Sequence, residues 1–360
     1  MLSAADDYPI HQVAEPARRV GTSDRNFYDR YYFNCHPSAP DLFLVFGMGQ
    51  YPNLGVADAF AVLGRDGRQR AVRASRELGA DRMDTTVGPF RIDVIAGLHQ
   101  LRFTLEPNDW GLDFDLTFTG AVPAVLEPRH QLHQHGRTII DTSRLAQTGT
   151  WSGRLTVDGV THDVTPDRWQ GTRDRSWGVR PVGDPEPPGI GAGKPPGSFY
   201  WVYAPLRFED FSIVVIAQED ATGRRSLEEA VRITPDGEPE QLGRPEIALS
   251  FTPGTREVTD AVLSFPYGPK VEVETVLPMA LGAGAGYGVG DWRHGQYLGP
   301  LVMQGQTYDV SDPGKRAAYW SVIDNLAKAR CDGQTGWGLF EFACFGPHQP
   351  SGFTGWEDTA

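Results

Sequence analysis

The chain has 360 residues, of which 40% are hydrophobic and 22% are charged, and its formal net charge is −13 at pH 7. This length suggests about two domains with apolar cores of their own. The acidic balance argues against duplex nucleic acid or an anionic membrane surface as the main partner, because both attract basic surfaces.

The sequence shows neither a signal-peptide pattern nor an apolar stretch of membrane-spanning length. We therefore expect a cytoplasmic protein that is not an integral membrane protein. The three cysteines, Cys35, Cys331 and Cys344, are far apart and odd in number. We expect them to be small buried groups rather than part of a disulfide framework or a thiolate zinc site.

Alternating patterns dominate the chain. Apolar and polar residues alternate through 112–119 and again through 271–275, which predicts half-buried antiparallel strands. Asp-Gly pairs at 66–67, 158–159 and 236–237 lie between such runs and predict tight hairpin turns, where the backbone needs a positive φ.

Three histidines lie close together at His130, His133 and His135. On a strand, His133 and His135 would share a face, and two imidazoles near each other can hold zinc. The sequence offers no further ligand at a fixed spacing apart from His130, so we expect no metal site here.

Residues 169–180 read Trp-Gln-Gly-Thr-Arg-Asp-Arg-Ser-Trp-Gly-Val-Arg and form the most polar cluster of the chain. If the segment is extended, Trp169, Arg173, Arg175 and Trp177 share one face, and Thr172, Asp174 and Ser176 share the other. Burying a guanidinium is costly unless a carboxylate or an aromatic ring receives it, so the cluster indicates a functional site or a buried ion network.

Asp174 lies between Arg173 and Arg175, and this positive surrounding predicts a lowered pKa. The residue would then be a poor acid. It could still act as a base, orient the arginines toward a developing negative charge, or form a structural ion pair between the two halves of the chain.

Residues 181–197 contain six prolines and five glycines. Neither a sheet nor a helix accommodates this density, so we expect a linker or a lid over a cavity mouth. We place the domain boundary there, with one β domain over 1–185 and a second over 186–360.

Two segments follow that admit more than one interpretation. The aromatic residues Tyr200, Trp201 and Tyr203 could line a cavity or simply fill a core. The run 282–290 alternates glycine with other residues, but no three glycines have the GxGxxG spacing. We therefore expect a glycine hairpin or a close backbone approach and no dinucleotide cofactor.

One amphipathic helix is predicted over 313–330. Asp312 would cap it, Pro313 would occupy its first position, and Gly333 would follow its end. Beyond it, Glu341 stands in a segment that is apolar on both alternating faces. Desolvation there should raise its pKa and suit it as a proton donor, although pairing with Arg173 or Arg175 is the alternative.

Several motifs of the chain resemble the hydroxyneurosporene synthase (carotenoid 1,2-hydratase)-like superfamily of tandem lipocalin-like (calycin) proteins, which includes kievitone hydratase and lipocalin-like Diels–Alderases. The segment 171–180 is the most specific, and shorter similarities lie at 47–53, 151–153, 292–295 and 336–341. Residues 200–203 lack the carboxylate that the carotenoid enzymes would use for alkene protonation, so the resemblance does not fix the reaction.

The resemblance implies an all-β fold, mainly antiparallel, with two consecutive lipocalin-like barrel or sandwich domains and an apolar cavity near their junction. It also implies an enzyme without metal or organic cofactor, a hydratase, dehydratase or cyclase, acting on a terpenoid- or polyketide-like molecule. The alternative is a carrier that binds such a ligand without changing it. The expected catalytic residues are Arg173, Asp174, Arg175, His294 and Glu341, and the expected substrate-binding residues are Tyr51, Trp169, Trp177, Tyr200, Trp201, Tyr203 and Trp292.

Overall fold

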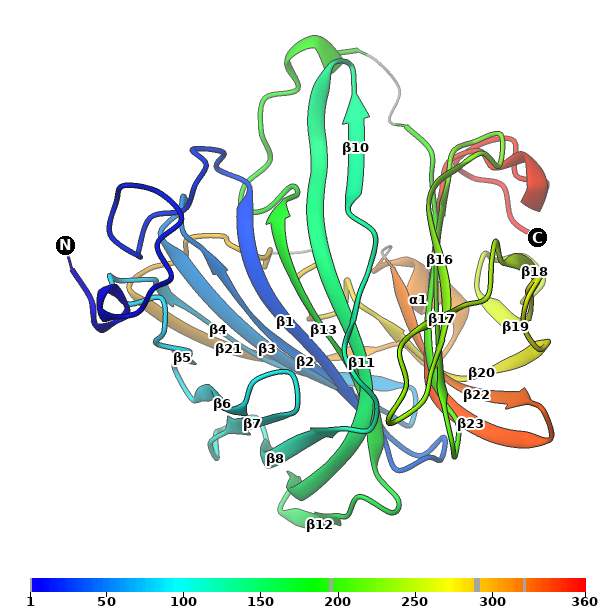
Figure 1. The fold of residues 1–360 in the computed structure, drawn as a ribbon, viewed down its shortest axis with the longest axis horizontal. Coiled ribbons are helices and arrows are strands. Elements are labelled where there is room, and N and C mark those ends of the chain that lie inside the picture. The colour runs from blue at the N-terminus through cyan, green and yellow to red at the C-terminus, as the bar shows by residue number, and fades with distance from the viewer. Residues whose placement is uncertain (1, 194–196, 288–291, 320–321) are drawn as a thin grey trace.

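The computed structural model describes residues 2–193, 197–287, 292–319 and 322–360. Within these residues the strands form two large sheets in which neighbouring strands are antiparallel, as the alternating sequence pattern predicts. Figure 1 shows the two sheets curling beside each other, the first in blue to green with the orange strand β21 at its edge and the second in green to red. The predicted all-β fold of lipocalin-like type is confirmed.

The first sheet has fourteen strands in the described residues. They are β1 (Phe27–Cys35), β2 (Phe43–Tyr51), β3 (Val56–Arg65), β4 (Arg68–Glu77), β5 (Thr86–Val87), β6 (Phe90–Ala96), β7 (Gln100–Leu105), β8 (Leu112–Gly120), β9 (Val125–Leu126), β10 (His130–Gln134), β11 (Arg137–Val157), β12 (Val160–Val164), β13 (Gln170–Val179) and β21 (Leu301–Asp309).

The second sheet has nine strands in the described residues. They are β14 (Phe199–Arg207), β15 (Ser212–Glu219), β16 (Arg225–Ile233), β17 (Glu240–Gln241), β18 (Glu246–Phe251), β19 (Val258–Ser264), β20 (Val271–Ala280), β22 (Ile323–Cys331) and β23 (Gln334–Phe345). The described helices are the 3-10 turns η1 (Ala4–Asp7), η2 (Gly189–Gly191) and η3 (Gln349–Ser351) and the helix α1 (Pro313–Ala317). None of them is long and apolar enough to cross a bilayer.

The strand β21 links the two halves of the chain. It comes late in the sequence but pairs with β4 at the edge of the first sheet, with Leu301 opposite Arg76 and Asp309 opposite Arg68. The boundary that we predict at 185–186 falls between β13 and β14, and β21 crosses it. The division into domains 1–185 and 186–360 stays a prediction.

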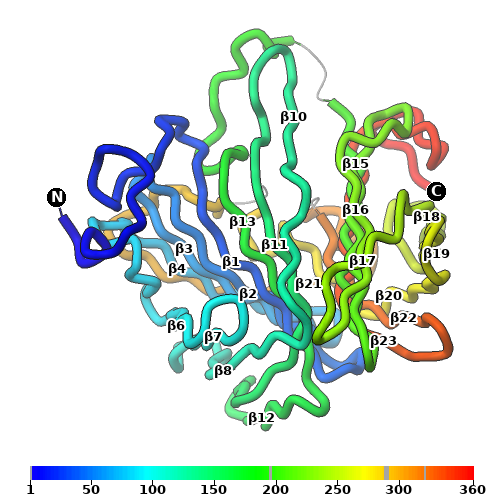
Figure 2. The backbone as a smooth tube through the Cα atoms, in the orientation of Figure 1, coloured from blue at the N-terminus to red at the C-terminus, as the bar shows by residue number. Residues whose placement is uncertain are grey.

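Most buried apolar side chains belong to three large clusters, and a smaller fourth cluster contains Tyr28, Tyr51, Val56 and Val182. One cluster, around Phe46 and Trp151, comes from the first sheet, and another, around Val202 and Phe340, comes from the second. A third cluster contains residues of both sheets, so it is the layer that joins them. Figure 2 shows the long hairpin of β10 and β11 rising beside this junction. A cavity in this layer can be lined by side chains from both halves of the chain.

The predicted helix over 313–330 is wrong for most of its length. Asp312 does cap a helix, since its side chain accepts a hydrogen bond from the Lys315 amide, but α1 ends at Ala317. Residues 320–321 lie outside the described residues, and β22 follows. This strand pairs on both sides, with β20 and β23, and both of its faces are buried. A strand that is buried on both faces need not alternate, so its apolar residues Ile323, Leu326 and Ala329 had the spacing of a helix.

The predicted turns give a mixed result. Asp66 and Asp158, each followed by a glycine with positive φ, turn the chain between paired strands. The pair at 236–237 lies in a turn, but Gly237 is not among the positive-φ residues. Gly333, predicted to end a helix, instead turns the β22–β23 hairpin together with Asp332. All three cysteines are free and buried, as expected.

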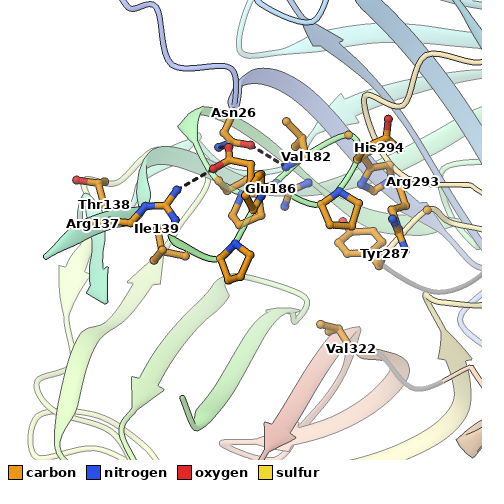
Figure 3. A pocket seen from close by; sticks show the side chains of 18 of the residues that line it. Asn26, Arg137, Thr138, Ile139, Val182, Glu186, Tyr287, Arg293, His294 and Val322 are labelled. Carbon is orange, nitrogen blue, oxygen red and sulfur yellow. Dashed lines mark hydrogen bonds and ion pairs between the residues drawn. The ribbon is translucent and has the colours of Figure 1, made fainter. Parts of the chain in front are cut away.

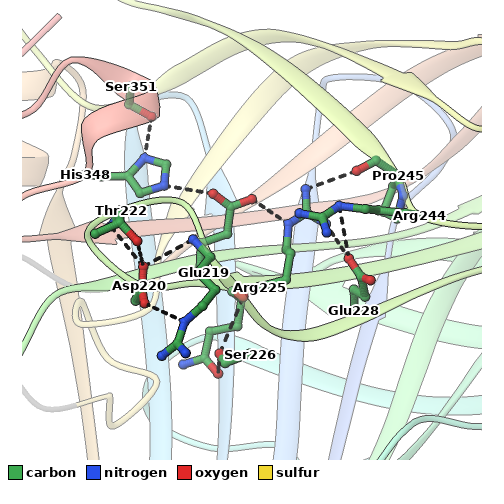
Figure 4. Close-up of polar contacts among 12 residues, drawn as sticks. Glu219, Asp220, Thr222, Arg225, Ser226, Glu228, Arg244, Pro245, His348 and Ser351 are labelled. Carbon is green, nitrogen blue, oxygen red and sulfur yellow. Dashed lines mark hydrogen bonds and ion pairs between the residues drawn. The ribbon is translucent and has the colours of Figure 1, made fainter.

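A buried ion network attaches the C-terminal segment to the second sheet (Figure 4). His348 Nε2 lies 2.9 Å from Glu219 Oε2, Arg225 Nε lies 2.5 Å from Glu219 Oε1, and the His348 ring stacks on Tyr200 at 4.1 Å. Burial raises the pKa of Glu219, but the hydrogen bonds from His348 and Arg225 outweigh it, so the pKa is lowered overall.

We expect Glu219→Gln to destabilise the protein by about 3 kcal/mol at pH 7, because it breaks a buried ion pair. A carboxyl whose pKa is lower in the folded state stabilises the protein at pH values above its unfolded pKa, and this stabilisation is lost as the pH falls. The difference in free energy of unfolding between the variant and the natural protein should therefore shrink toward pH 3. Urea unfolding at both pH values measures it. Glu228→Gln is the matched control, because Glu228 contacts the same Arg225 at 3.5 Å but is 35% exposed. An equal loss in both variants would contradict the prediction.

Candidate active site between the two sheets

A cavity of about 210 Å³ lies between the sheets, in the layer where their side chains meet. We call it the inner cavity. Its lining from the first sheet includes Arg30, Tyr32, Thr142, Arg144, Asp174 and Ser176, and its lining from the second includes Trp201, Ile216, Leu227 and Glu341. Apolar, aromatic and ionisable groups therefore face the same small volume.

A larger pocket of about 660 Å³ adjoins the inner cavity and shares Arg180, Tyr287 and Val322 with it. We call it the outer pocket. Figure 3 shows its lining, to which the proline-rich segment 181–188 contributes beside Tyr287 and His294. The segment predicted to be a linker or lid thus forms one wall of the approach to the inner cavity.

Strand register explains why the ionisable groups meet. In the second sheet Glu341 lies opposite Asp324 on one neighbouring strand and opposite Tyr203 on the other. In the first sheet Asp174 lies opposite Tyr32. Side chains directly opposite on neighbouring antiparallel strands project to the same face. Each sheet therefore presents a row of polar groups to the space between them.

Glu341 and Asp324 form a coupled carboxyl pair. Burial raises the pKa of both, most strongly for Asp324, where the neighbouring charge of Glu341 raises it further. The Tyr32 hydroxyl donates to Asp324, and the Trp201 indole donates to Glu341. Two carboxyls this close do not both ionise readily, so the pair holds a proton near neutral pH. This confirms the expected raised pKa of Glu341.

Arg144 is the cation beside this pair. Its Nε donates to Glu127 Oε2 at 2.6 Å, and its guanidinium lies over the Tyr203 ring at 4.2 Å and the Trp201 ring at 5.2 Å. Burial outweighs this cation and raises the pKa of Glu127 to about 7. Arg144 Nη2, Glu127 Oε1 and Tyr203 Oη find no partner among the described residues, although all three atoms are buried. These atoms can receive a polar group of a ligand.

Asp174 faces the inner cavity, and the pKa that we predicted for it is wrong. We expected its flanking arginines to lower the pKa, but the pKa is raised because burial outweighs the positive charges of Arg144, Arg30 and Arg180. The neighbours in sequence matter little, because Arg173 and Arg175 point to the other face of β13.

Arg173 and Arg175 do not converge with Glu341, and neither pairs with it. Arg173 is buried within the first sheet and donates to Gln147 at 2.8 Å, while Arg175 binds Asp29 and lies over the Tyr31 ring at 4.0 Å. The predicted alternation of this strand is correct, and Arg175 lies on the face away from the inner cavity. The catalytic role expected for the two arginines stays a prediction. Arg144 and Arg30, from β11 and β1, take their place at the inner cavity.

The sequence of residues 2–354 matches a family of unknown function, DUF8625. The chain belongs to this family. No curated protein matches the sequence. The match spans nearly the whole chain and includes the strands of both sheets.

Three solved structures are similar to this chain. A candidate ATTH from Nitrosomonas europaea has a TM-score of 0.53 and 11% identity, over 93% of this chain and 98% of that chain. Kievitone hydratase from Nectria haematococca matches at 13% identity over 94% of both chains, with a TM-score of 0.47. CghA with Sch210972 matches at 12% identity over 89% of this chain and 88% of that chain, with a TM-score of 0.46. The chain therefore shares its overall fold with the candidate ATTH.

His294 lies in the outer pocket of this family member rather than in the inner cavity. Its Nε2 is 2.5 Å from the Ala285 carbonyl oxygen and 3.1 Å from the Arg30 guanidinium, which also donates to the Tyr287 hydroxyl at 3.1 Å. Burial first, and Arg30 next, hold the pKa of His294 well below its ordinary value. The ring is therefore neutral and does not act as an acid near pH 7.

The aromatic residues predicted to bind substrate divide into two groups. Trp201 lines the inner cavity, Tyr203 lies beside it under Arg144, and Trp177 lines a different pocket of the first sheet. The others are placed in packing roles: Tyr51 donates to Asp58, Trp169 joins the core of the first sheet, Tyr200 stacks on His348, and Trp292 lies under Arg73.

Two further predictions concerned cofactors. His130 Nε2 contacts Gln218 Oε1 at 2.5 Å, and His135 lies in the turn after β10, so the described part of the chain gathers no three potential metal ligands there. Of the glycine run 282–290, residues 288–290 lie outside the described residues. At Gly284 a Cβ would lie 2.4 Å from the Cβ of Ala71, which fits the close backbone approach that we expected.

Proposed function

We propose that this protein is a cofactor-independent enzyme of the lyase or isomerase type, which transfers a proton to or from a hydrophobic small molecule in the inner cavity. The observation that carries the proposal is the coupled pair of Glu341 and Asp324 at the wall of a cavity that also holds an arginine. Carboxyl groups with raised pKa values, desolvated beside a charged partner in a cavity, are typical of acid–base sites.

Each group has a distinct part in this proposal. Glu341 faces the cavity and exchanges the proton with the substrate, while Asp324 stores the proton behind it. The free Nη2 of Arg144 receives a substrate oxygen and stabilises negative charge that develops there. Trp201 and the apolar residues Ile216 and Leu227 hold the carbon skeleton. Hydration and dehydration both need such a proton transfer next to a polarised oxygen, and a cyclisation needs it when protonation or deprotonation starts the ring closure.

The relatives in structure support the class but not the substrate. One of them is named a hydratase, which is consistent with proton transfer on a small molecule. The inner cavity alone, at about 210 Å³, is below the usual range of about 300–1,000 Å³ for small-molecule pockets. A substrate would therefore extend into the outer pocket, past Tyr287 and Arg180.

Deuterium incorporation tests this function and separates it from a carrier. The natural protein is incubated in D2O with the hydrophobic compounds extracted from its own preparation and with a panel of prenylated phenols and terpene alcohols. We expect at least one compound to acquire a deuterium on carbon, detected by mass spectrometry, because the proton of the carboxyl pair exchanges with solvent. Compounds that bind but return unlabelled and unchanged would overturn the enzyme and favour the carrier.

A further inference from the structure

Asp174 lines the inner cavity but has no part in the proton transfer proposed for Glu341. Its side chain is partly exposed, and its carboxyl group accepts no hydrogen bond from the described residues. Glu127, by contrast, binds Arg144 at 2.6 Å, and Glu341 accepts a hydrogen bond from Trp201. A carboxylate that faces a cavity without a hydrogen-bond partner can accept one from an O–H group placed there, such as that of a water molecule.

The wall of the cavity that holds Asp174 is polar, and the wall opposite is mostly apolar. Ser176 and Thr142 belong to the first sheet, as Asp174 does, and add two hydroxyl groups to the lining. From the second sheet, Ile216 and Leu227 contribute hydrocarbon side chains. A buried water molecule needs two or more polar partners, so the first wall suits water and the second suits the carbon skeleton of a substrate.

Asp174 and the Glu341–Asp324 pair differ in their charged neighbours. Burial raises the pKa of Asp174, but Arg144 and two further guanidinium groups oppose the rise and favour its ionised form. In the pair, the charge of one carboxyl group opposes ionisation of the other, so the pair holds a proton. Carboxyl groups in one cavity whose environments differ in this way can divide the roles of base and acid.

Arg144 is next to both carboxyl sites. On β11 it lies opposite Ser176 of β13, so Asp174, two residues away, projects to the same face. Its guanidinium lies over the ring of Trp201 at 5.2 Å, and the Trp201 indole donates to Glu341. A guanidinium disfavours positive charge beside it and stabilises an oxyanion. This position therefore suits an enolate intermediate rather than the carbocation that protonation of an isolated alkene would give.

We propose that Asp174 is the catalytic base that activates water in the inner cavity, and that the substrate is a hydrophobic α,β-unsaturated carbonyl compound. This inference rests on the proposed function and adds a catalytic residue and a substrate class to it. Asp174 takes a proton from water, the water oxygen bonds to the β-carbon, and the conjugated electrons move onto the carbonyl oxygen held by Arg144. The enolate then takes a proton at its α-carbon from the Glu341–Asp324 pair. Water is thereby added, the reverse sequence removes it, and proton exchange with solvent restores both carboxyl sites.

Citral and citronellal test the substrate class in the natural protein. They share a carbon skeleton, an aldehyde and an isolated double bond, but only citral has a double bond conjugated to the carbonyl. In D2O we expect citral to gain water at the conjugated double bond, with deuterium on the α-carbon, as mass spectrometry and NMR would show. Citronellal should gain no water, but its α-carbon should acquire deuterium, because the carboxyl pair can remove a proton there by the reverse of its own step. Hydration of the isolated double bond in either compound, or no hydration of citral, would overturn the proposal.

Variants of Asp174 separate its chemistry from a structural role. Asp174→Asn should lower the rate of citral hydration about 10²-fold or more and leave deuterium exchange in citronellal unchanged, because that exchange needs only Glu341 and Arg144. A structural role would lower both rates together, as we expect for Glu341→Gln. Asp163→Asn, at an exposed carboxyl group on β12 of the same sheet, should change neither.

If Asp174→Asn does not fold, Asp174→Glu, which keeps a base, is compared with Asp174→Gln, which has the same shape without one. Hydration at the natural rate in a folded variant without the carboxyl group would remove Asp174 from the mechanism. Labelling of citronellal or another compound without hydration of citral would refute the conjugated substrate and leave the proton-transfer function in place. A natural protein that labels no carbon in any compound would refute both.

Discussion

Glu341→Gln should lower turnover by about 10²- to 10⁴-fold, because it removes the carboxyl group that exchanges a proton with the substrate and leaves a side chain of the same shape. The glutamine oxygen can still accept the hydrogen bond from Trp201, and Asp324 can still donate to it, so the fold should persist. The rate is measured with the compound that acquires deuterium, and thermal unfolding checks that the variant is folded.

Two further variants sharpen this result. Asp324→Asn keeps a donor toward Glu341 but removes the stored proton. We expect a smaller loss of rate together with a changed pH profile, because Glu341 then titrates alone. Glu246→Gln, an exposed carboxyl on β18 of the same sheet, should leave the rate unchanged. Full activity in folded Glu341→Gln would remove Glu341 from the mechanism.

Arg144→Met should abolish turnover and also destabilise the protein by about 3–5 kcal/mol, because it leaves Glu127 buried without its ion-pair partner. Arg144 lowers the pKa of Glu127, so its loss raises that pKa further above 7. A raised folded-state pKa of a carboxyl costs stability as pH rises past the unfolded value. The destabilisation should therefore be largest above pH 7 and smaller near pH 5, as urea unfolding at the two pH values would measure.

The double variant Arg144→Met with Glu127→Gln separates structure from chemistry. Removing both charges should restore part of the stability and reduce its pH dependence, while turnover stays absent because the substrate oxygen has lost its cation. Recovery of turnover together with stability would mean that Arg144 only supports the fold. A stability loss that does not change with pH would mean that Glu127 is not the group left unpaired.

Some features of the site could be predicted because they depend on residues that are close together in one strand. The alternation of residues 173–177 placed Asp174 and the arginines on opposite faces, and the apolar surroundings of Glu341 predicted its raised pKa. Both inferences depend on periodicity and desolvation, which a sequence displays directly. The direction of the pKa shift at Asp174 could not be predicted, since it depends on burial by a sheet far along the chain.

Other members of the site carry no local signal. Arg144 lies within the long strand β11 and Asp324 within a segment whose spacing resembled a helix, and nothing nearby in sequence marks either residue. Strand register brings Asp324 opposite Glu341, and packing of one sheet on the other brings Arg144 to the same cavity.

The sequence by itself determined the class of the fold and the faces of its strands, because hydrophobic alternation and turn residues act over a few positions. The tertiary structure alone decided which charges meet. Residues 323–331 form a strand by pairing with β20 and β23 although their apolar spacing is helical. Packing of the two sheets then places Arg144, and not Arg173, at the cavity that Glu341 lines. Charge interactions act through space at distances that only folding sets, so no local pattern could have specified them.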